Sequence, residues 1–500
     1  MTTSSKDRPK GLPARLAAPA AIALGAVVLR VISGVGFVNY DTLYALAWGG
    51  QLSRGQAPAY AVAIAPTPHP LLELLGVVLS PLGPGAVADV TIALAFLVLS
   101  ACGWAIYRLG ALWFGRAAGV VAAAVFLTRV PVLSYGVRAY VDLPYLLLVL
   151  GAILLESRGR SESGHPAGAP VLALLSLAGL LRPEAWAFSG LYLPYALEWL
   201  PARMRGHPPL PARQPRGQRE IAGLALLGAS APLVWLLSDL AITGEPLWSL
   251  THTRSTASAL DRTTGIANAP EYIPRRIGEI LRPPVLLGAA LGGALSLLWL
   301  RRRALLGAGA GVLAVVVFAA FASLGLPINT RYAFLAAALL SVFCGAGVCG
   351  WLCLERGDRR RRWWMVAGAL ILAGLLAYAP AQYRSADREF AKLARQQRIE
   401  GDLVALVEDH AINLRCGPVG VPNHAPIPLL ALYLETSPAN VRSAVAAPIA
   451  AGVYVDPASM QVEHDYVLDA RDPHPSVSVP PGFTAVTANR SWLIFHRCSK

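Results

Sequence analysis

Long apolar segments, separated by short polar loops, make up most of the chain as far as about residue 380. A helix needs about 20 apolar residues to cross the hydrocarbon core of a bilayer, and the longer segments reach that length. We therefore expect a mainly α-helical, polytopic membrane protein. The pattern predicts about eleven membrane-spanning helices, at residues 16–38, 86–108, 117–135, 142–156, 170–181, 185–200, 220–241, 284–300, 304–326, 331–354 and 363–381.

Basic residues are concentrated in alternate loops, and this alternation gives the expected orientation. Lys6 precedes the first span, and clusters such as Arg301–Arg303 and Arg359–Arg362 follow later ones. Because cytoplasmic loops carry the excess of Lys and Arg, we expect a cytoplasmic N-terminus. An odd number of spans then places the C-terminus outside, in a protein of the plasma (inner) membrane. This topology depends on three short segments, since losing one would invert the helices after it: 142–156, 170–181 and 185–200.

The first predicted extracytoplasmic loop, 39–85, is long and contains a single basic residue, Arg54. Within it, the segment Leu71–Leu82 is apolar but too short to span the bilayer. We expect this segment to be a re-entrant or interfacial helix. The loop and the spans together form the first of two predicted domains, residues 1–381.

Residues 382–500 have a different pattern and are predicted to form a small extracytoplasmic α/β domain. The segment Ser385–Ala411 is charged and has helical periodicity. Short apolar runs typical of strands follow it, and the last ones form a predicted hairpin around Ala488–Arg490. The other candidate strands are Val419–Val421, Val453–Val455 and Tyr466–Leu468.

Composition supports the membrane class. The chain is 55% hydrophobic and 14% charged, whereas a soluble domain is nearer a quarter charged. The net charge of +14 does not indicate a nucleic-acid partner, because the arginines cluster in short loops between apolar segments, as the positive-inside rule expects. Membrane lipids are the expected surroundings.

The six cysteines fall into two groups. Four lie in apolar segments, whereas Cys416 and Cys498 lie in the polar C-terminal region. Two cysteines alone in a domain exposed to an oxidising compartment predict a disulfide. The sequence contains no CxxC or HExxH spacing, so we expect no structural zinc site.

The candidate chemistry lies on the predicted outer face. Ionisable residues at or in the membrane are costly and are therefore candidates for function. Carboxylates can accept a proton, and arginine binds phosphate in a bidentate manner. The topology brings to this face Asp41, His69, Arg138, Asp142, Arg182, Glu184, Arg331 and Tyr332.

Five short motifs occur along the chain in a recognisable order. They are the series Asp41, Tyr44, Ala47, Gly55, Pro58 and Tyr60, then His69-Pro70-Leu71, Asp142-Leu143-Pro144, Arg182-Pro183-Glu184 and Arg331-Tyr332. Over about residues 16–380 the pattern resembles the GT-C superfamily of membrane glycosyltransferases. Within it, the pattern resembles enzymes that use polyprenyl-phosphate sugars, such as protein O-mannosyltransferases and lipid A aminoarabinose transferases. The second motif lacks the second proline of that family.

The resemblance implies that a sugar moves from a polyprenyl-phosphate donor to a hydroxyl of a lipid, glycan or protein acceptor. Asp41 would be the general base and Asp142 a second active-site acid, and direct displacement would invert the anomeric carbon. We expect no essential cofactor, because a monophosphate donor carries little charge; the alternative is Mg²⁺ or Mn²⁺ held by Asp41 with Asp142 or His69. The expected substrate-binding residues are Tyr60, His69, Arg138, Arg182, Glu184, Arg331 and Tyr332.

Each candidate also has a structural interpretation. Either aspartate could cap a helix, Arg138 could extend to the membrane interface, and Arg182 and Glu184 could form a local pair. At the level of function, the rivals are a transporter or flippase of lipid-linked sugars and a non-catalytic membrane sensor or scaffold. A transporter should show paired halves with broken helices, and the sequence contains no such symmetry.

Overall fold

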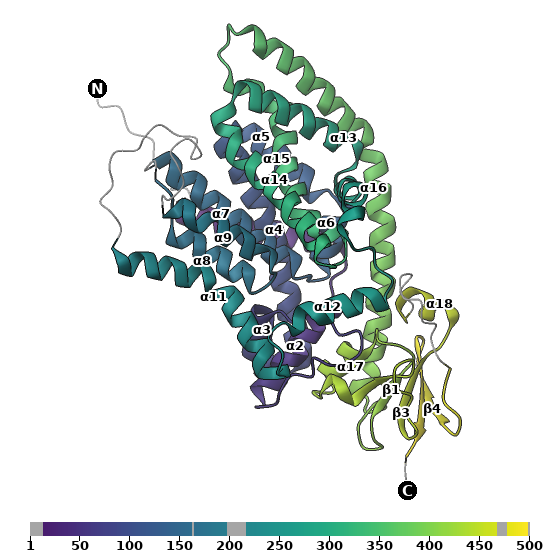
Figure 1. The fold of residues 1–500 in the computed structure, drawn as a ribbon. Helices are drawn as coiled ribbons and strands as arrows, with labels where there is room; N and C mark the ends of the chain where they lie inside the picture. The colour runs from purple at the N-terminus through teal and green to yellow at the C-terminus, as the bar shows by residue number, and fades with distance from the viewer. Residues whose placement is uncertain (1–13, 163–164, 198–216, 468–477, 499–500) are drawn as a thin grey trace, which may run out of the picture.

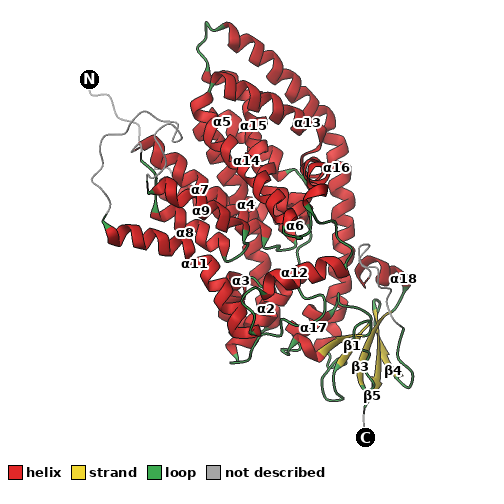
Figure 2. Cartoon of the chain, viewed as in Figure 1, coloured by secondary structure: helices red, strands yellow, loops and turns green. Residues whose placement is uncertain are grey.

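The computed structural model describes residues 14–162, 165–197, 217–467 and 478–498. Figure 1 shows an elongated body of helices with a small sheet-containing region at one end, and Figure 2 shows that the strands are confined to that region. The fold is therefore mainly α-helical with a small C-terminal sheet, as the sequence predicts.

Within the described residues, seven helices are long and apolar enough to cross a membrane, and a bent helix pair could supply an eighth span. This finding supports a multi-pass membrane protein, while the count of eleven spans stays a prediction. Five of them are α1 (Ala14–Ser33), α4 (Pro84–Phe114), α11 (Gln218–Thr243), α14 (Arg301–Ser323) and α16 (Arg359–Glu408). The other two are α13 (Ala269–Trp299) and α15 (Phe334–Cys349), which adjoining short helices extend to Ile266–Trp299 and Thr330–Cys353.

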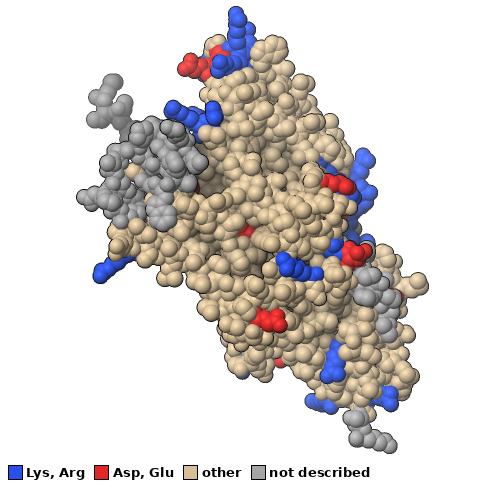
Figure 3. All heavy atoms as spheres, viewed as in Figure 1, with Lys and Arg blue, Asp and Glu red and all other residues tan. Residues whose placement is uncertain are grey.

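The three short predicted spans are helices in the structure. They are α7 (Asp142–Glu162), α8 (Ala169–Gly179) and α9 (Glu184–Ala196). In the view of Figure 3, the upper part of the helical body is a broad surface with few charged side chains, and Lys and Arg gather towards its ends. Such an uncharged surface between charged ends suits a bilayer.

The predicted helix 117–135 is wrong as a single helix. The structure divides it into α5 (Arg116–Leu127) and α6 (Val130–Val137), which are bent by 67°. Pro131 explains the break, because proline lacks an N–H donor and disfavours helical geometry at the preceding residue. The Arg129 side chain stabilises the break by donating to the carbonyls of Val125 and Leu281 at 3.0 and 3.1 Å.

The first loop contains two helices, α2 (Tyr40–Ser53) and α3 (Pro70–Leu79), followed by the short helix η1 (Ser80–Leu82). Asn39 caps α2: its side chain accepts hydrogen bonds from the backbone N–H groups of Asp41 and Thr42. The two helices pack closely because glycines face each other. A Cβ atom on Gly49 would lie 2.6 Å from the Cα of Gly76.

Helix α16 links the membrane body to the C-terminal region. It has 50 residues, which corresponds to about 75 Å, and it runs without a break across the predicted domain boundary at 381. Figure 1 shows it passing along one side of the helical body and down to the sheet region. One continuous helix therefore joins the membrane body to the C-terminal region.

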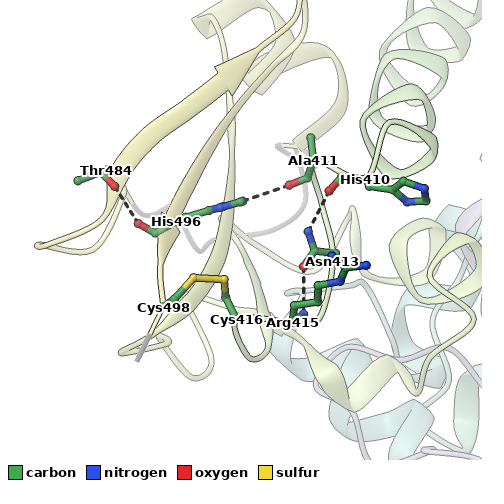
Figure 4. The surroundings of a disulfide bond; sticks show 8 residues. All are labelled: His410, Ala411, Asn413, Arg415, Cys416, Thr484, His496 and Cys498. Carbon is green, nitrogen blue, oxygen red and sulfur yellow. Dashed lines mark hydrogen bonds between the residues drawn. A yellow bond between two sulfur atoms is a disulfide. The ribbon is translucent and has the colours of Figure 1, made fainter. Parts of the chain in front are cut away.

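The C-terminal region contains a five-stranded mixed sheet in the order β2-β1-β3-β5-β4. The pairs β1–β2 and β1–β3 are parallel, and β3–β5 and β4–β5 are antiparallel. Cys416 and Cys498 form a disulfide that joins the residues before the first strand to those after the last (Figure 4). The strands are β1 (Val419–Val421), β2 (Val441–Ser443), β3 (Gly452–Pro457), β4 (Thr484–Ala488) and β5 (Trp492–Arg497).

One predicted strand is wrong. Residues Glu463–Val467, which include Tyr466 of the expected strand, form a π-helical turn after α18 (Met460–Val462), and Leu468 lies outside the described residues. The side chain of Ser459 begins this helical segment by accepting a hydrogen bond from the N–H of Val462. The ring of Tyr466 then packs against Trp492 of β5, with centroids 5.8 Å apart.

The C-terminal region and the first loop share one hydrophobic core. Leu43, Leu46 and Trp48 of α2 belong to the same buried cluster as Leu403 of α16 and Leu430 of α17 (Ile427–Tyr433). Burial of these side chains stabilises the contact by about 1.5–3 kcal/mol for each large aliphatic or aromatic residue. Helix α2 is therefore held by the C-terminal region as well as by the membrane body.

Candidate active site

A cavity of about 1820 Å³ lies between the ends of the membrane helices and the C-terminal region. Residues of α2, α6, α13 and the turn before α15 line it, together with residues 382–400 of α16 and the turn at Glu463–Val467. Among the residues predicted from sequence, the cavity is lined by Asp41, Arg138, Arg331 and Tyr332.

The carboxylate of Asp41 binds a cation at the cavity wall. Arg331 Nη1 lies 2.5 Å from Asp41 Oδ2 and donates a hydrogen bond to it. Because Asn39 caps α2, the side chain of Asp41 is free from the capping role that the sequence left open. Burial raises the pKa of Asp41, but the charge and hydrogen bond of Arg331 outweigh this effect, so the pKa lies below its ordinary value.

Arg331 also lies close to a second group of charged side chains. Arg331 Nη1 is 3.9 Å from Asp142 Oδ2. The other carboxylate oxygen of Asp142 accepts a hydrogen bond from Arg182, whose Nε and Nη2 also donate to Glu184 Oε1 at 3.1 and 2.5 Å. The five side chains form one row of alternating charges: Asp41, Arg331, Asp142, Arg182 and Glu184.

Asp142, Arg182 and Glu184 are buried, whereas Asp41 and Arg331 are half-buried at the cavity wall, and the whole row lies where helices begin or end. Asp142 and Arg182 are 1% and 7% exposed. Asp142 begins α7, Glu184 begins α9, and Arg331 lies in the short helix η3 (Thr330–Ala333) just before α15. The guanidinium of Arg182 lies 4.3 Å from the ring centroid of Tyr332, which adds a cation–π contact. Arg182 and Glu184 thus bind each other and a wider network.

Arg138 lies on the cavity wall between two aromatic rings. Its guanidinium is 5.2 Å from the ring centroid of Tyr135 and 4.9 Å from that of Tyr140. It donates to the backbone carbonyl and hydroxyl of Ser134, and this hydroxyl donates to Glu389 Oε1 of α16 at 2.7 Å. A fixed cation therefore lines the cavity in which Arg331 and Asp41 lie.

His69 and Tyr60 lie outside the set of residues that line the cavity. His69 is 8% exposed, and burial, with help from the two arginines of the row, lowers its pKa to about 3, so the ring is neutral. Its Nδ1 has no hydrogen-bond partner among the described residues. Tyr60 donates to Glu73 Oε2 at 2.7 Å and packs on Trp48, so it supports α2 against α3.

The residues that position Arg331 were not among those predicted from the sequence. Glu279 of α13 accepts hydrogen bonds from Thr330 and from Arg276, and Arg276 Nε donates to the carbonyl of Ile328. These contacts fix the turn that carries Arg331. The only available signal was that Thr330 directly precedes the Arg331-Tyr332 motif, which does not identify a partner on another helix.

The described residues contain no group of three or more His, Cys, Asp or Glu side chains that could hold a metal ion.

No protein-family model matches the sequence, and no curated protein matches it by sequence. Solved structures do match it, and they show that the chain shares their fold, in agreement with the resemblance of its motifs to the GT-C superfamily.

Three structures illustrate this likeness. ArnT from Cupriavidus metallidurans, bound to undecaprenyl phosphate, has a TM-score of 0.56 and 13% identity over 96% of this chain and 98% of its own. The arabinofuranosyltransferase AftD from mycobacteria has a TM-score of 0.53 and 14% identity over 98% of this chain and 40% of its own. The third is the archaeal oligosaccharyltransferase AglB from Archaeoglobus fulgidus, in complex with an inhibitory peptide and a dolichol-phosphate. It has a TM-score of 0.51 and 12% identity over 90% of this chain and 69% of its own.

The buried part of the row predicts a strong and coupled effect on stability. We expect Arg182→Met to lower the free energy of unfolding by about 3–5 kcal/mol, because it leaves the carboxylates of Asp142 and Glu184 buried without their cation. The double variant Arg182→Met/Asp142→Asn should lose less than the sum of the two single losses, by about 0.5–3 kcal/mol. Unfolding in mixed micelles, followed by circular dichroism, measures both quantities. Additive losses would show that the two side chains do not interact.

Proposed function

We propose that the protein is a membrane glycosyltransferase that moves a sugar from a polyprenyl-phosphate donor to an acceptor hydroxyl, on the extracytoplasmic side of the membrane. The observation that carries this proposal is the carboxylate of Asp41, held by Arg331 at the wall of a large cavity. The GT-C fold supports it. The acceptor is a lipid, a glycan or a protein, and the C-terminal region with its sheet lies on the same extracytoplasmic side.

The donor class follows from the position of the cations. ArnT binds undecaprenyl phosphate and AglB binds a dolichol-phosphate in structures that share this fold. In this chain, Arg138 and Arg331 line the cavity at the ends of apolar helices. A polyprenyl tail in the bilayer would bring its phosphate to these two guanidinium groups, which suit phosphate oxygens.

The reaction requires one proton acceptor and one electrophile. Asp41 takes the proton of the acceptor hydroxyl, and that oxygen attacks the anomeric carbon as the bond to the phosphate oxygen breaks. The polyprenyl phosphate leaves with the bonding electron pair, so it needs no acid. A single displacement of this kind inverts the anomeric carbon. Because the phosphate is bound to arginine, a cation lies next to the leaving group while negative charge develops on it.

Donor binding activates the base. In the free protein, Arg331 binds Asp41 and weakens it as a base. When the donor phosphate binds Arg331, the cation is shared and a negative charge lies close to Asp41. Both changes raise the pKa of the carboxylate, so proton abstraction becomes favourable only when donor is bound.

The remaining candidates position this pair. Asp142 lies between Arg331 and Arg182, and Glu184 holds Arg182 from the other side. Tyr332 stacks on Arg182 and also lines the cavity. Tyr60 and His69 do not line the cavity, and they support α2. The ring of His69 is buried and neutral, and its Nδ1, which has no partner among the described residues, can accept or donate one hydrogen bond when substrate is bound.

No divalent metal is required in this scheme, because the donor monophosphate carries little charge and two arginines neutralise it. A transporter is less consistent with the arrangement. Transporters place their charged site near the bilayer midplane in broken helices, whereas the charged row lies where helices begin or end.

The role of Asp41 is tested by Asp41→Asn. Asparagine keeps the size of the side chain but cannot take a proton, so we expect sugar transfer to fall by about 10²- to 10⁴-fold. Proteoliposomes with a panel of radiolabelled polyprenyl-phosphate sugars measure the transfer. The matched control is Asp387→Asn, which removes an exposed carboxylate of α16 that does not line the cavity. Full transfer by a folded Asp41→Asn protein would remove this residue from the reaction.

The activation step predicts two different pH profiles. The free protein has a depressed Asp41 pKa, so kcat/KM should fall only below the ordinary titration range of a carboxyl group. With donor bound the pKa is higher, so the acidic decline of kcat should begin at higher pH. In Arg331→Gln the cation is absent, and the decline of kcat/KM should move to higher pH. A profile of kcat/KM that is unchanged in this variant would contradict the coupling.

A further inference from the structure

A second pair of cations lines the same cavity. Arg388 and Lys392 lie one helical turn apart on the outer half of α16, and both side chains are exposed and line the cavity. Residues four apart on a helix lie about 5–6 Å from each other, and like charges at this spacing repel. The two positive charges therefore form one local patch, which we name the α16 basic pair.

Three of the carboxylates that line the cavity, those of Glu389, Glu400 and Asp465, have other partners. Glu389 accepts a hydrogen bond from Ser134, and Glu400 accepts one from Gln396 at 3.0 Å. Asp465 of the π-helical turn lies 3.2 Å from Arg395 Nε. Arg388 donates only to its own helix, from Nε to the carbonyl of Arg384 at 3.2 Å. Within the described part of the chain, no ion pair neutralises either member of the α16 basic pair.

This patch differs from the cations assigned to the donor. Arg331 is neutralised by Asp41, and Arg138 is fixed between two tyrosines. The α16 basic pair comes from a different element, α16, the helix that connects the membrane body with the sheet region. A polyprenyl phosphate brings a single phosphate, so a second unneutralised patch in the same cavity fits a second anion.

We propose that Arg388 and Lys392 bind an anionic group of the acceptor, a phosphate or a carboxylate, while the donor phosphate occupies Arg331 and Arg138. This inference rests on the proposed function, and it narrows the acceptor class to molecules that carry a negative charge close to the hydroxyl that receives the sugar. Both members of the pair are binding residues and take no part in proton transfer.

The test measures binding to the full-length protein in nanodiscs of neutral lipid. The protein is first saturated with undecaprenyl phosphate to fill the donor site, and glucose 1-phosphate is then titrated by calorimetry, with methyl glucoside as the uncharged probe. We expect glucose 1-phosphate alone to bind. The variant Arg388→Gln/Lys392→Gln should weaken this binding by about tenfold or more, because it removes two charge-assisted contacts.

The matched control is Arg384→Gln/Arg398→Gln, which removes the same charge from exposed positions of α16 that do not line the cavity. We expect this control to bind like the wild type. Equal binding by all three proteins, or loss of all binding after saturation with undecaprenyl phosphate, would overturn the proposal. Adding phosphatidic acid to the nanodiscs identifies the source of the anion: competition indicates a lipid headgroup, and no competition indicates a water-soluble acceptor.

The readout is independent of sugar transfer, so the two proposals can fail separately. Binding that depends on the α16 basic pair in a protein that transfers no sugar would contradict only the proposed function. Sugar transfer that is unaffected by the double variant, together with unchanged binding of glucose 1-phosphate, would contradict only the acceptor site.

Discussion

Three carboxylates and two guanidinium groups lie in one row, and their mutual neutralisation constrains the whole helical assembly. A buried charge without its partner costs several kcal/mol, so the buried carboxylates of Asp142 and Glu184 depend on Arg182, while Asp41 and Arg331 pair at the cavity wall. They come from α2, α7, the turn between α8 and α9, the start of α9, and η3. Correct packing of the helix ends and formation of the candidate site are therefore the same event.

The C-terminal region contributes to this constraint through packing. Helix α2 carries Asp41 on one side and buries Leu43, Leu46 and Trp48 in a core that it shares with α16 and α17. The disulfide between Cys416 and Cys498 closes the sheet region behind this core. A change in the C-terminal region can consequently move the proposed base, although no residue of that region forms an ion pair with it among the described residues.

The sequence located the charged row well and its geometry poorly. Charges at membrane edges are conspicuous because the surrounding positions are apolar, so Asp142, Arg182 and Arg331 could be selected by type and topology alone. Their pairing depends on contacts between distant helices, which no local pattern encodes. For the same reason, Glu279 could not be identified from the sequence. The α16 basic pair could not be identified either, because its sequence pattern is that of an ordinary solvated helix face. Local rules failed where proline divided 117–135, and where Tyr466 joined a helical turn instead of a strand.

The most direct test of the account is a cryo-electron microscopy structure of the protein in nanodiscs with undecaprenyl phosphate. The account predicts phosphate oxygens at about 2.7–3.2 Å from the guanidinium of Arg331, with Asp41 separated from that arginine and facing the open cavity. A phosphate bound away from Arg331, with the ion pair between Asp41 and Arg331 intact, would contradict the exchange on which the proposed catalysis depends.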